Sequence, residues 1–259
     1  MYQSGWLGPD QSTGSPPSVA RGRDARHRVQ IPIRRILSMP PRVIIHNTIS
    51  LDNAVIGFDI DIGLHYEILL SYKPDAMLIG STTAKTGIEM FLDSEEPEVP
   101  ADRHRPPQDP ADPRPVGVFV DSRGVLHGLL HFYRRLEHIR DVVVLVSKTT
   151  PEAYLAYLEE REYPHIRCGE ERVDLAAALG ELAERFGVET VVTDSGSDLN
   201  AALMEQGIAD EISLIVTPAI AGPATKKLFG SVRTPRTLEL IASAELGEGR
   251  VHLRYRFPG

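Results

Sequence analysis

Short apolar runs of strand length alternate with helical patterns along most of this 259-residue chain, and this alternation most limits its possible folds. Apolar runs predict strands at residues 42–47, 75–79, 116–120, 141–146, 190–193 and 211–217. Helical spacing predicts helices at residues 61–72, 81–90, 126–139, 151–162, 173–186 and 198–206. This order predicts an α/β fold, with a mostly parallel sheet and helices on both faces. Residues 236–244 and 250–257 flank the turn Gly247-Glu248-Gly249 and predict an antiparallel hairpin at the sheet edge.

Two stretches fall outside the alternation. Residues 1–39 contain much Gly, Pro, Ser and Arg without an apolar period, so we expect a disordered or loosely attached extension before a single domain at residues 40–259. An organelle transit peptide is a second interpretation of this extension. Residues 93–115 contain seven prolines, which exclude a helix or a central strand, and we expect a surface insertion there.

The formal net charge of −8 is divided unevenly along the chain. The first 40 residues hold six Arg and two Asp, so they carry +4 and the remaining residues carry −12. An acidic body repels phosphate backbones, which argues against a nucleic-acid partner. No apolar run approaches the roughly 18 residues that span a bilayer, so we expect a soluble protein without a membrane partner. The single cysteine, Cys168, cannot form an internal disulfide, which fits a reducing compartment and predicts a cytoplasmic protein.

Several familiar motifs are absent from the sequence. No GxGxxG follows a predicted strand, and neither GxxxxGK[ST] nor HExxH occurs, which disfavours a standard Rossmann or P-loop protein. His127 and His131 lie four residues apart on a predicted helix, but no third ligand matches their spacing, so we expect no metal site. Asp194-Ser195-Gly196 resembles a serine-protease triplet, but its place between a strand and a helix disfavours a nucleophilic serine.

Small polar residues follow three of the predicted strands. These segments are Gly80-Ser81-Thr82-Thr83, Ser147-Lys148-Thr149-Thr150 and Thr193-Asp194-Ser195-Gly196-Ser197-Asp198. Ligands of α/β sheets bind at the carboxyl ends of strands, and free N–H groups at a helix start suit an anionic phosphate. Each segment alone is no more than a usual helix cap, but three together predict a ligand of the nucleotide type.

Five segments then occur in a recognisable order. They are residues 45–52 (IHNTISLD), 75–83 (DAMLIGSTT), 118–123 (VFVDSR), 194–200 (DSGSDLN) and 207–222, which begins GIADEI. Together they resemble the riboflavin-biosynthesis pyrimidine reductase family, whose members have a RibD C-terminal-domain-like, dihydrofolate-reductase-like fold. The resemblance covers about residues 41–230, and its most specific parts are the SLD, DAxxxGxxT and DEIxLxxxP segments.

The resemblance implies an NADPH-dependent reductase that converts the ribosylamino side chain of a phosphoribosylamino-pyrimidine to ribitylamino, and it implies a homodimer. NADPH would supply the hydride to C1′ of the ring-opened imine. Carried over by position, the implied cofactor contacts are Gly80, Ser81, Thr83, Ser147, Lys148, Ser195, Gly196 and Ser197. The implied substrate contacts are Asn47, Ser50, Asp52 and Arg123, with Arg123 on the phosphate, and the implied catalytic residues are Asp121 and Asp194. By position alone, Asp52 and Asp121 are equally typical of turns, and Asp194 of a helix cap.

Three departures from the family pattern leave the substrate open. Asn53 and Ala54 follow Asp52 where the family commonly has Gly-Lys, so its lysine is missing. Asp194-Ser195-Gly196 stands in place of Glu-Gly-Gly, and the Pro-rich stretch replaces a polar segment that contributes arginines. One alternative is therefore a reductase of the same fold with another pterin- or pyrimidine-like substrate. A second is a non-catalytic nucleotide-binding regulatory protein.

Overall fold

The computed structural model describes residues 39–91, 96–109, 111–223 and 225–258. The predicted N-terminal extension lies outside the described residues except for Met39, and so do the first residues of the predicted Pro-rich insertion. Among the described residues, no helix is long and apolar enough to cross a membrane.

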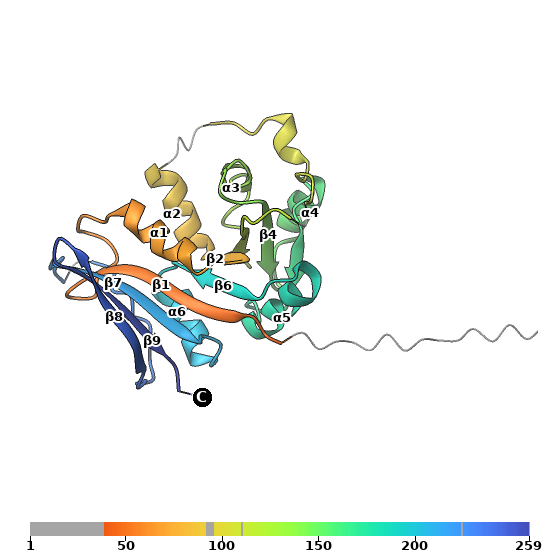
Figure 1. Ribbon diagram of the computed structural model, residues 1–259. Helices are drawn as coiled ribbons and strands as arrows, with labels where there is room; N and C mark the ends of the chain where they lie inside the picture. The colour runs from red at the N-terminus through yellow and green to blue at the C-terminus, as the bar shows by residue number, and fades with distance from the viewer. Residues whose placement is uncertain (1–38, 92–95, 110, 224, 259) are drawn as a thin grey trace, which may run out of the picture. The chain divides into compact units, whose positions relative to one another are not determined.

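The described chain forms one nine-stranded sheet in the order β5-β4-β3-β2-β6-β1-β7-β9-β8 (Figure 1). The first seven strands in this order run parallel, and β9 and β8 are antiparallel to their neighbours. Their bounds are β1 Arg42–Ser50, β2 Ala76–Gly80, β3 Val116–Val120, β4 Asp141–Val146, β5 His165–Arg167, β6 Thr190–Thr193, β7 Glu211–Thr217, β8 Glu239–Gly247 and β9 Arg250–Arg256. This confirms the predicted α/β class, with a mostly parallel sheet and a C-terminal antiparallel hairpin.

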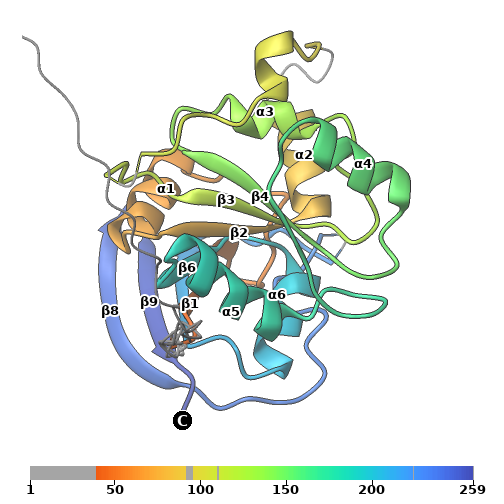
Figure 2. The same ribbon diagram turned by 90° about the vertical axis from the view of Figure 1, so that its right-hand side faces the viewer.

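Helices cover both faces of the sheet, as predicted (Figure 2). Their bounds are α1 Ile62–Ser71, α2 Ser81–Phe91, α3 Leu130–Arg134, α4 Glu152–Glu160, α5 Leu175–Phe186 and α6 Ser197–Glu205. Alternate residues of the strands point to opposite faces, so Ile45 packs in a core with α5 and α6, whereas its neighbour Ile44 packs in a core with α1 to α4. Strands buried on both faces explain why the sequence shows continuous apolar runs.

Most predicted element boundaries agree with the structure to within two residues, and four differences are larger. The strand predicted at residues 42–47 continues to Ser50, and the three-residue strand β5 was not predicted. The helix predicted at 126–139 is only the short α3, because Gly128 has a φ of 79°, outside the right-handed helical region. The first strand of the hairpin begins at Glu239 rather than at residue 236.

The described part of the Pro-rich stretch is held against α3 and α4 by ion pairs. It contains a short 3₁₀ helix, η1 (Pro100–Arg103). The expectation that this stretch holds no helix is therefore wrong for this single turn. Asp102 of η1 is buried and lies 2.5 Å from the Arg135 guanidinium, and Glu98 accepts from Arg161 at 2.7 Å. Proline at the first helical position suits a short turn because its missing N–H would have no partner there.

A chain of buried polar side chains crosses β9, β7 and β1. His46 on β1 is fully buried, and burial, followed by the nearby His65, lowers its pKa to about 3, so the ring is neutral. Its Nε2 lies 3.2 Å from the His65 carbonyl, which can only accept, so Nε2 carries the proton and Nδ1 accepts. The Ser213 hydroxyl therefore donates to Nδ1 at 2.8 Å, and its oxygen accepts from His252 Nε2 at 2.8 Å.

The neutral state of His46 predicts a loss of stability in acid. Below about pH 6.5 His46 is protonated in the unfolded chain but stays neutral in the folded chain. Acidification toward pH 3 therefore favours unfolding. The loss from this one group is at most about 1.4 kcal/mol per pH unit. Urea unfolding between pH 7.5 and 5 measures it, and His46→Gln should give a shallower dependence than the wild type. The exposed His104→Gln is the control, and equal slopes for wild type and His46→Gln would contradict the expectation.

Candidate functional site

The candidate site lies where β6 is inserted between β1 and β2. The connections that leave β1 and β2 lead to α1 and α2 on one face of the sheet, whereas the connection that leaves β6 leads to α6 on the other face (Figure 2). Neighbouring loops that diverge to opposite faces open a crevice at the carboxyl ends of the strands, which is where α/β sheets bind ligands. Most of the residues implied by the resemblance lie along this edge of the sheet.

The loop after β6 is held in place by two buried amides. Asn47 Nδ2 on β1 donates to the carbonyls of Asp194 and Ser195 at 3.1 and 3.2 Å. Asn200 Nδ2 on α6 donates to Asn47 Oδ1 at 3.1 Å and to the Ser195 carbonyl at 2.8 Å. The amide of Asn47, predicted to contact substrate, is thus committed within the protein and shapes the loop.

On the β2 side of β6, the ends of two helices meet. The buried Ser195 hydroxyl accepts from the Gly80 N–H at 2.9 Å, and the Gly196 N–H donates to Thr83 Oγ1 at 3.4 Å. Helix α2 begins at Ser81, and α6 begins at Ser197 without a side-chain cap from Gly196. The positive ends of two helix dipoles therefore lie side by side, an arrangement that suits a phosphate group.

Two other predicted cofactor contacts lie farther along the same edge. Ser147 follows β4, three strand positions from β6, or about 14 Å at the usual strand spacing. It is fully buried, and its N–H donates to Thr150 Oγ1 at 3.0 Å. The Lys148 ammonium is exposed and lies 2.5 Å from the Glu170 carboxylate. The structure therefore brings Gly80, Ser195 and Gly196 together but not Ser147 and Lys148.

Asp52 is the centre of a turn that joins two distant segments. Its carboxylate accepts from the N–H groups of Ala221 and Gly222 at 3.0 and 2.9 Å and from the Ser50 hydroxyl at 2.6 Å. Lys227 Nζ lies 2.6 Å away, and this bond, with the others, holds the pKa of Asp52 well below its usual range. Both predicted substrate residues of this turn, Ser50 and Asp52, are thus engaged with the protein itself.

The departures from the family pattern beside Asp52 have a structural counterpart. Asn53 has a φ of 65°, a left-handed conformation that Asn tolerates better than most residues other than Gly. Ala54 forms an isolated bridge with Lys227, so a lysine ammonium lies in this turn although Ala54 carries none. The sequence contains no signal for this contact, because Lys227 lies 175 residues from Asp52 along the chain.

Asp121 is buried to 1% exposure directly after β3. Its two carboxylate oxygens accept from the N–H groups of Val125 and Leu126 at 3.0 and 2.8 Å. The carboxylate thus fixes the turn that carries Arg123. Arg123 itself is exposed, and within the described ranges its guanidinium has no hydrogen-bond or ion-pair partner.

Asp194 differs from the other two carboxylates because no backbone N–H donates to its side chain among the described contacts. The Asp194 side chain is 15% exposed, and Oδ2 lies 3.8 Å from His65 Nε2 on α1. Tyr66, the next residue of α1, also faces this carboxylate, and burial together with the nearby Asp194 raises the pKa of the Tyr66 hydroxyl. Among the described contacts, Asp194 is therefore the carboxylate of the three that meets side chains of α1 rather than backbone donors.

Sequence reasoning missed both α1 residues of this group. His65 lies four residues before the buried Leu69, so both fall on the same face of the helix. That spacing could have placed His65 toward the sheet, but nothing local indicates that Asp194, 129 positions later, would lie opposite it.

The two histidines considered as metal ligands do not form a cluster. His127 precedes α3 and has its ring 4.6 Å from that of Tyr157, whereas His131 Nε2 lies 3.2 Å from the Glu96 carbonyl. Within the described part of the chain, no group of three or more His, Cys, Asp or Glu could hold a metal ion.

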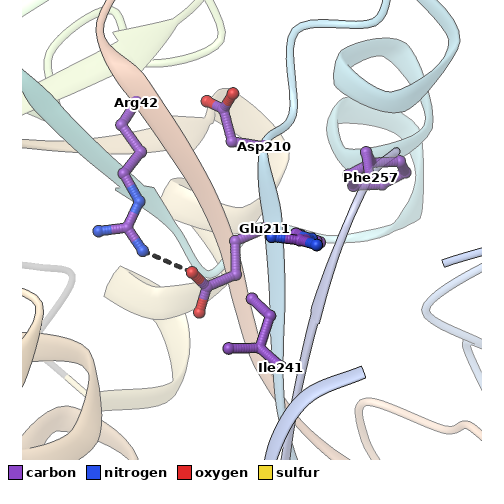
Figure 3. A pocket seen from close by; sticks show the side chains of 6 residues that line it. Arg42, Asp210, Glu211, Ile241 and Phe257 are labelled. Carbon is purple, nitrogen blue, oxygen red and sulfur yellow. Dashed lines mark hydrogen bonds and ion pairs between the residues drawn. The ribbon is translucent and has the colours of Figure 1, made fainter. Parts of the chain in front are cut away.

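A cavity of about 380 Å³ lies at the amino-terminal ends of β1 and β7, and Figure 3 shows the side chains that line it. It is lined by Arg42, Asp210, Glu211, Ile241, Arg256 and Phe257. Although burial raises the pKa of Glu211, hydrogen bonds from Arg254 and Arg42 hold it below the usual range. Through these contacts the Glu211 carboxylate joins β7 to β1 and to β9.

Comparison with known proteins identifies the family of the chain. The family model of the RibD C-terminal domain matches residues 69–252. The 2,5-diamino-6-ribosylamino-4(3H)-pyrimidinone 5′-phosphate reductase of Methanothermobacter thermautotrophicus is 29% identical over 192 residues, which is 71% of this chain and 81% of that protein.

Two solved structures share the fold. A pyrimidine reductase-like protein of Corynebacterium diphtheriae superposes with a TM-score of 0.64 at 15% identity, over 85% of this chain and 92% of that one. The riboflavin biosynthesis reductase of Saccharomyces cerevisiae has a TM-score of 0.58 at 16% identity, over 84% and 90% of the two chains. With the family model matched over most of its length, the chain belongs to the RibD C-terminal domain family.

Proposed function

We propose that this protein is an NADPH-dependent reductase of riboflavin biosynthesis that converts the ribosylamino side chain of a phosphoribosylamino-pyrimidine to ribitylamino. The observation that carries the proposal is the point beside β6 where the connections diverge, at which Asp194 follows the strand and the starts of α2 and α6 are joined by hydrogen bonds. The family membership and the printed name of the Methanothermobacter relative support the same reaction.

The reaction needs a hydride at C1′ of the ring-opened imine and a proton on its nitrogen. NADPH supplies the hydride when it is bound. We propose that the N–H groups and hydroxyls between β2 and β6 bind the phosphates of the cofactor. A more distant part of the cofactor would reach Ser147 and Lys148. The N–H groups and hydroxyls between β2 and β6 are those of Gly80, Ser81, Thr83, Ser195, Gly196 and Ser197. Asp194, on the β1 side, passes the proton to this nitrogen, because among the described contacts no backbone N–H donates to its carboxyl group.

On the substrate side, we assign the phosphate to Arg123. A guanidinium is a fork donor suited to phosphate, and Arg123 is exposed without a partner among the described residues. Asp121 holds the turn that carries Arg123. Its role is therefore to position Arg123 rather than to contact the substrate. Asn47, Ser50 and Asp52 shape the wall of the site through the bonds described above.

The direct test follows NADPH absorbance at 340 nm with the phosphoribosylamino-pyrimidine as substrate. Asp194→Asn should lower kcat on the order of a hundredfold with an unchanged melting temperature, because it removes the proton donor. Asp121→Asn should lower the melting temperature as well, because an amide gives up one oxygen that accepts a backbone N–H. Tight NADPH binding without turnover of any pyrimidine or pterin substrate would sink the proposal and favour the regulatory protein.

Arg123→Gln tests the phosphate assignment. The loss of a charge-assisted contact should raise KM for the phosphorylated substrate on the order of tenfold or more while KM for NADPH stays within about twofold. The matched control is Arg236→Gln, at another exposed arginine before β8. An equal KM for substrate in both variants would show that another group binds the phosphate.

We also propose that the protein is a homodimer through β8. This strand ends the sheet, and every residue from Glu239 to Glu245 is exposed, including Leu240 at 58% and Ile241 at 43%. An unprotected apolar edge strand favours pairing with another chain. Location in the cytoplasm and the absence of a nucleic-acid partner stay predictions from the sequence.

Light scattering after gel filtration tests the dimer. The wild type should elute at the dimer mass, and the double variant Leu240→Glu/Ile241→Glu at the monomer mass, because charges on β8 oppose burial. Leu70→Glu, at an exposed leucine of α1, is the control and should stay dimeric. A monomeric wild type would refute this part of the proposal.

A further inference from the structure

We propose that His65, held by Thr48, pairs with Asp194 and replaces the proton that Asp194 delivers. The inference rests on the reductase proposed above and adds a positioning residue to it. His65 acts through Asp194 and does not itself contact substrate.

The His65 side chain is oriented on both sides of its ring. Thr48 Oγ1 on β1 lies 3.0 Å from Nδ1, and Asp194 Oδ2 lies 3.8 Å from Nε2. The His65 backbone is held as well, because its carbonyl accepts from His46 Nε2 at 3.2 Å. With 8% of the residue exposed, the imidazole has little freedom to turn away from the Asp194 carboxylate.

The other titratable groups that face Asp194 are poor proton sources near neutral pH. On β1, burial keeps His46 neutral with a pKa of about 3. On α1 and α3, burial raises the pKa of Tyr66 and Tyr133, and Asp194 adds to both shifts. Tyr133 moreover donates its hydroxyl proton to the Ala84 carbonyl at 2.8 Å. His65, with Nε2 at 3.8 Å from Asp194 Oδ2, is therefore the partner that we assign to this carboxylate.

The proton balance of the step follows from this pairing. Carbon C1′ receives the hydride with its two electrons, and the imine nitrogen receives a proton through the Asp194 carboxyl group, which ends the step as the carboxylate it was at the start. That proton comes from Nε2 of His65, and the His65 ring then takes another proton from solvent. Among the described contacts, no backbone N–H donates to the Asp194 side chain, which faces His65 and Tyr66, whereas both oxygens of Asp121 accept from backbone N–H groups.

Kinetics of Thr48 and His65 variants test the pair. His65→Gln should lower kcat on the order of a hundredfold, leave both KM values within about twofold, and remove one limb of the pH profile of kcat. Thr48→Val removes the hydroxyl at similar size and should lower kcat, whereas Thr48→Ser should restore it. His104→Gln, on an exposed histidine far along the surface, is the control. A wild-type kcat and pH profile in His65→Gln overturns the inference.

A second readout needs no activity. In ¹⁵N-histidine-labelled protein at pH 7, Asp194→Asn and Thr48→Val should each shift the ring nitrogen resonances of His65, whereas Asp121→Asn should not. Unmoved His65 resonances in Asp194→Asn overturn the pairing even if the enzyme is active. A wild type that turns over no pyrimidine refutes the proposed function, and shifted resonances would then still support the pairing itself.

Discussion

The position of β6 between β1 and β2 sets the geometry of the candidate site. A strand that arrives late in the chain and leaves toward the opposite face separates two loops that would otherwise run in parallel. The crevice, the meeting of the α2 and α6 starts, and the approach of Asp194 to α1 all result from this one insertion. Asn47 and Asn200 hold it, because their amides satisfy the carbonyls of the loop that β6 leads into.

Polar residues inside β1 do not destabilise the core, because each has a hydrogen-bond partner. A buried polar group without a hydrogen bond destabilises the fold by a few kcal/mol, so His46, Thr48 and Ser50 must be paired by neighbours from other strands and helices. Their partners come from β7, α1 and the turn after β1. The contact between Thr48 and His65, which satisfies the buried Thr48 hydroxyl, also orients the His65 ring toward the site.

Three aspartates of similar appearance in the sequence have different surroundings. Asp52 is surrounded by donors and Lys227, Asp121 by two backbone N–H groups, and Asp194 by a histidine and a tyrosine. The first two lie in turns, as one interpretation of the sequence held, and the third is left for chemistry. Residue type and position after a strand could not separate them, because the donors lie up to 175 residues away.

The α/β class, the parallel strands and the hairpin could be predicted from the sequence, because strand and helix periods and turn residues are local properties. That a ligand binds at the carboxyl ends of the strands stays a prediction. The sequence also indicated the family through segments whose order survives in this chain. The tertiary structure decided which side chains meet. His65 meets Asp194, and Lys227 meets Asp52. Asn47, which was expected to contact the substrate, instead binds the loop after β6. These contacts depend on the strand order, which places β6 beside β1 although 139 residues separate their ends, and no local pattern encodes that separation.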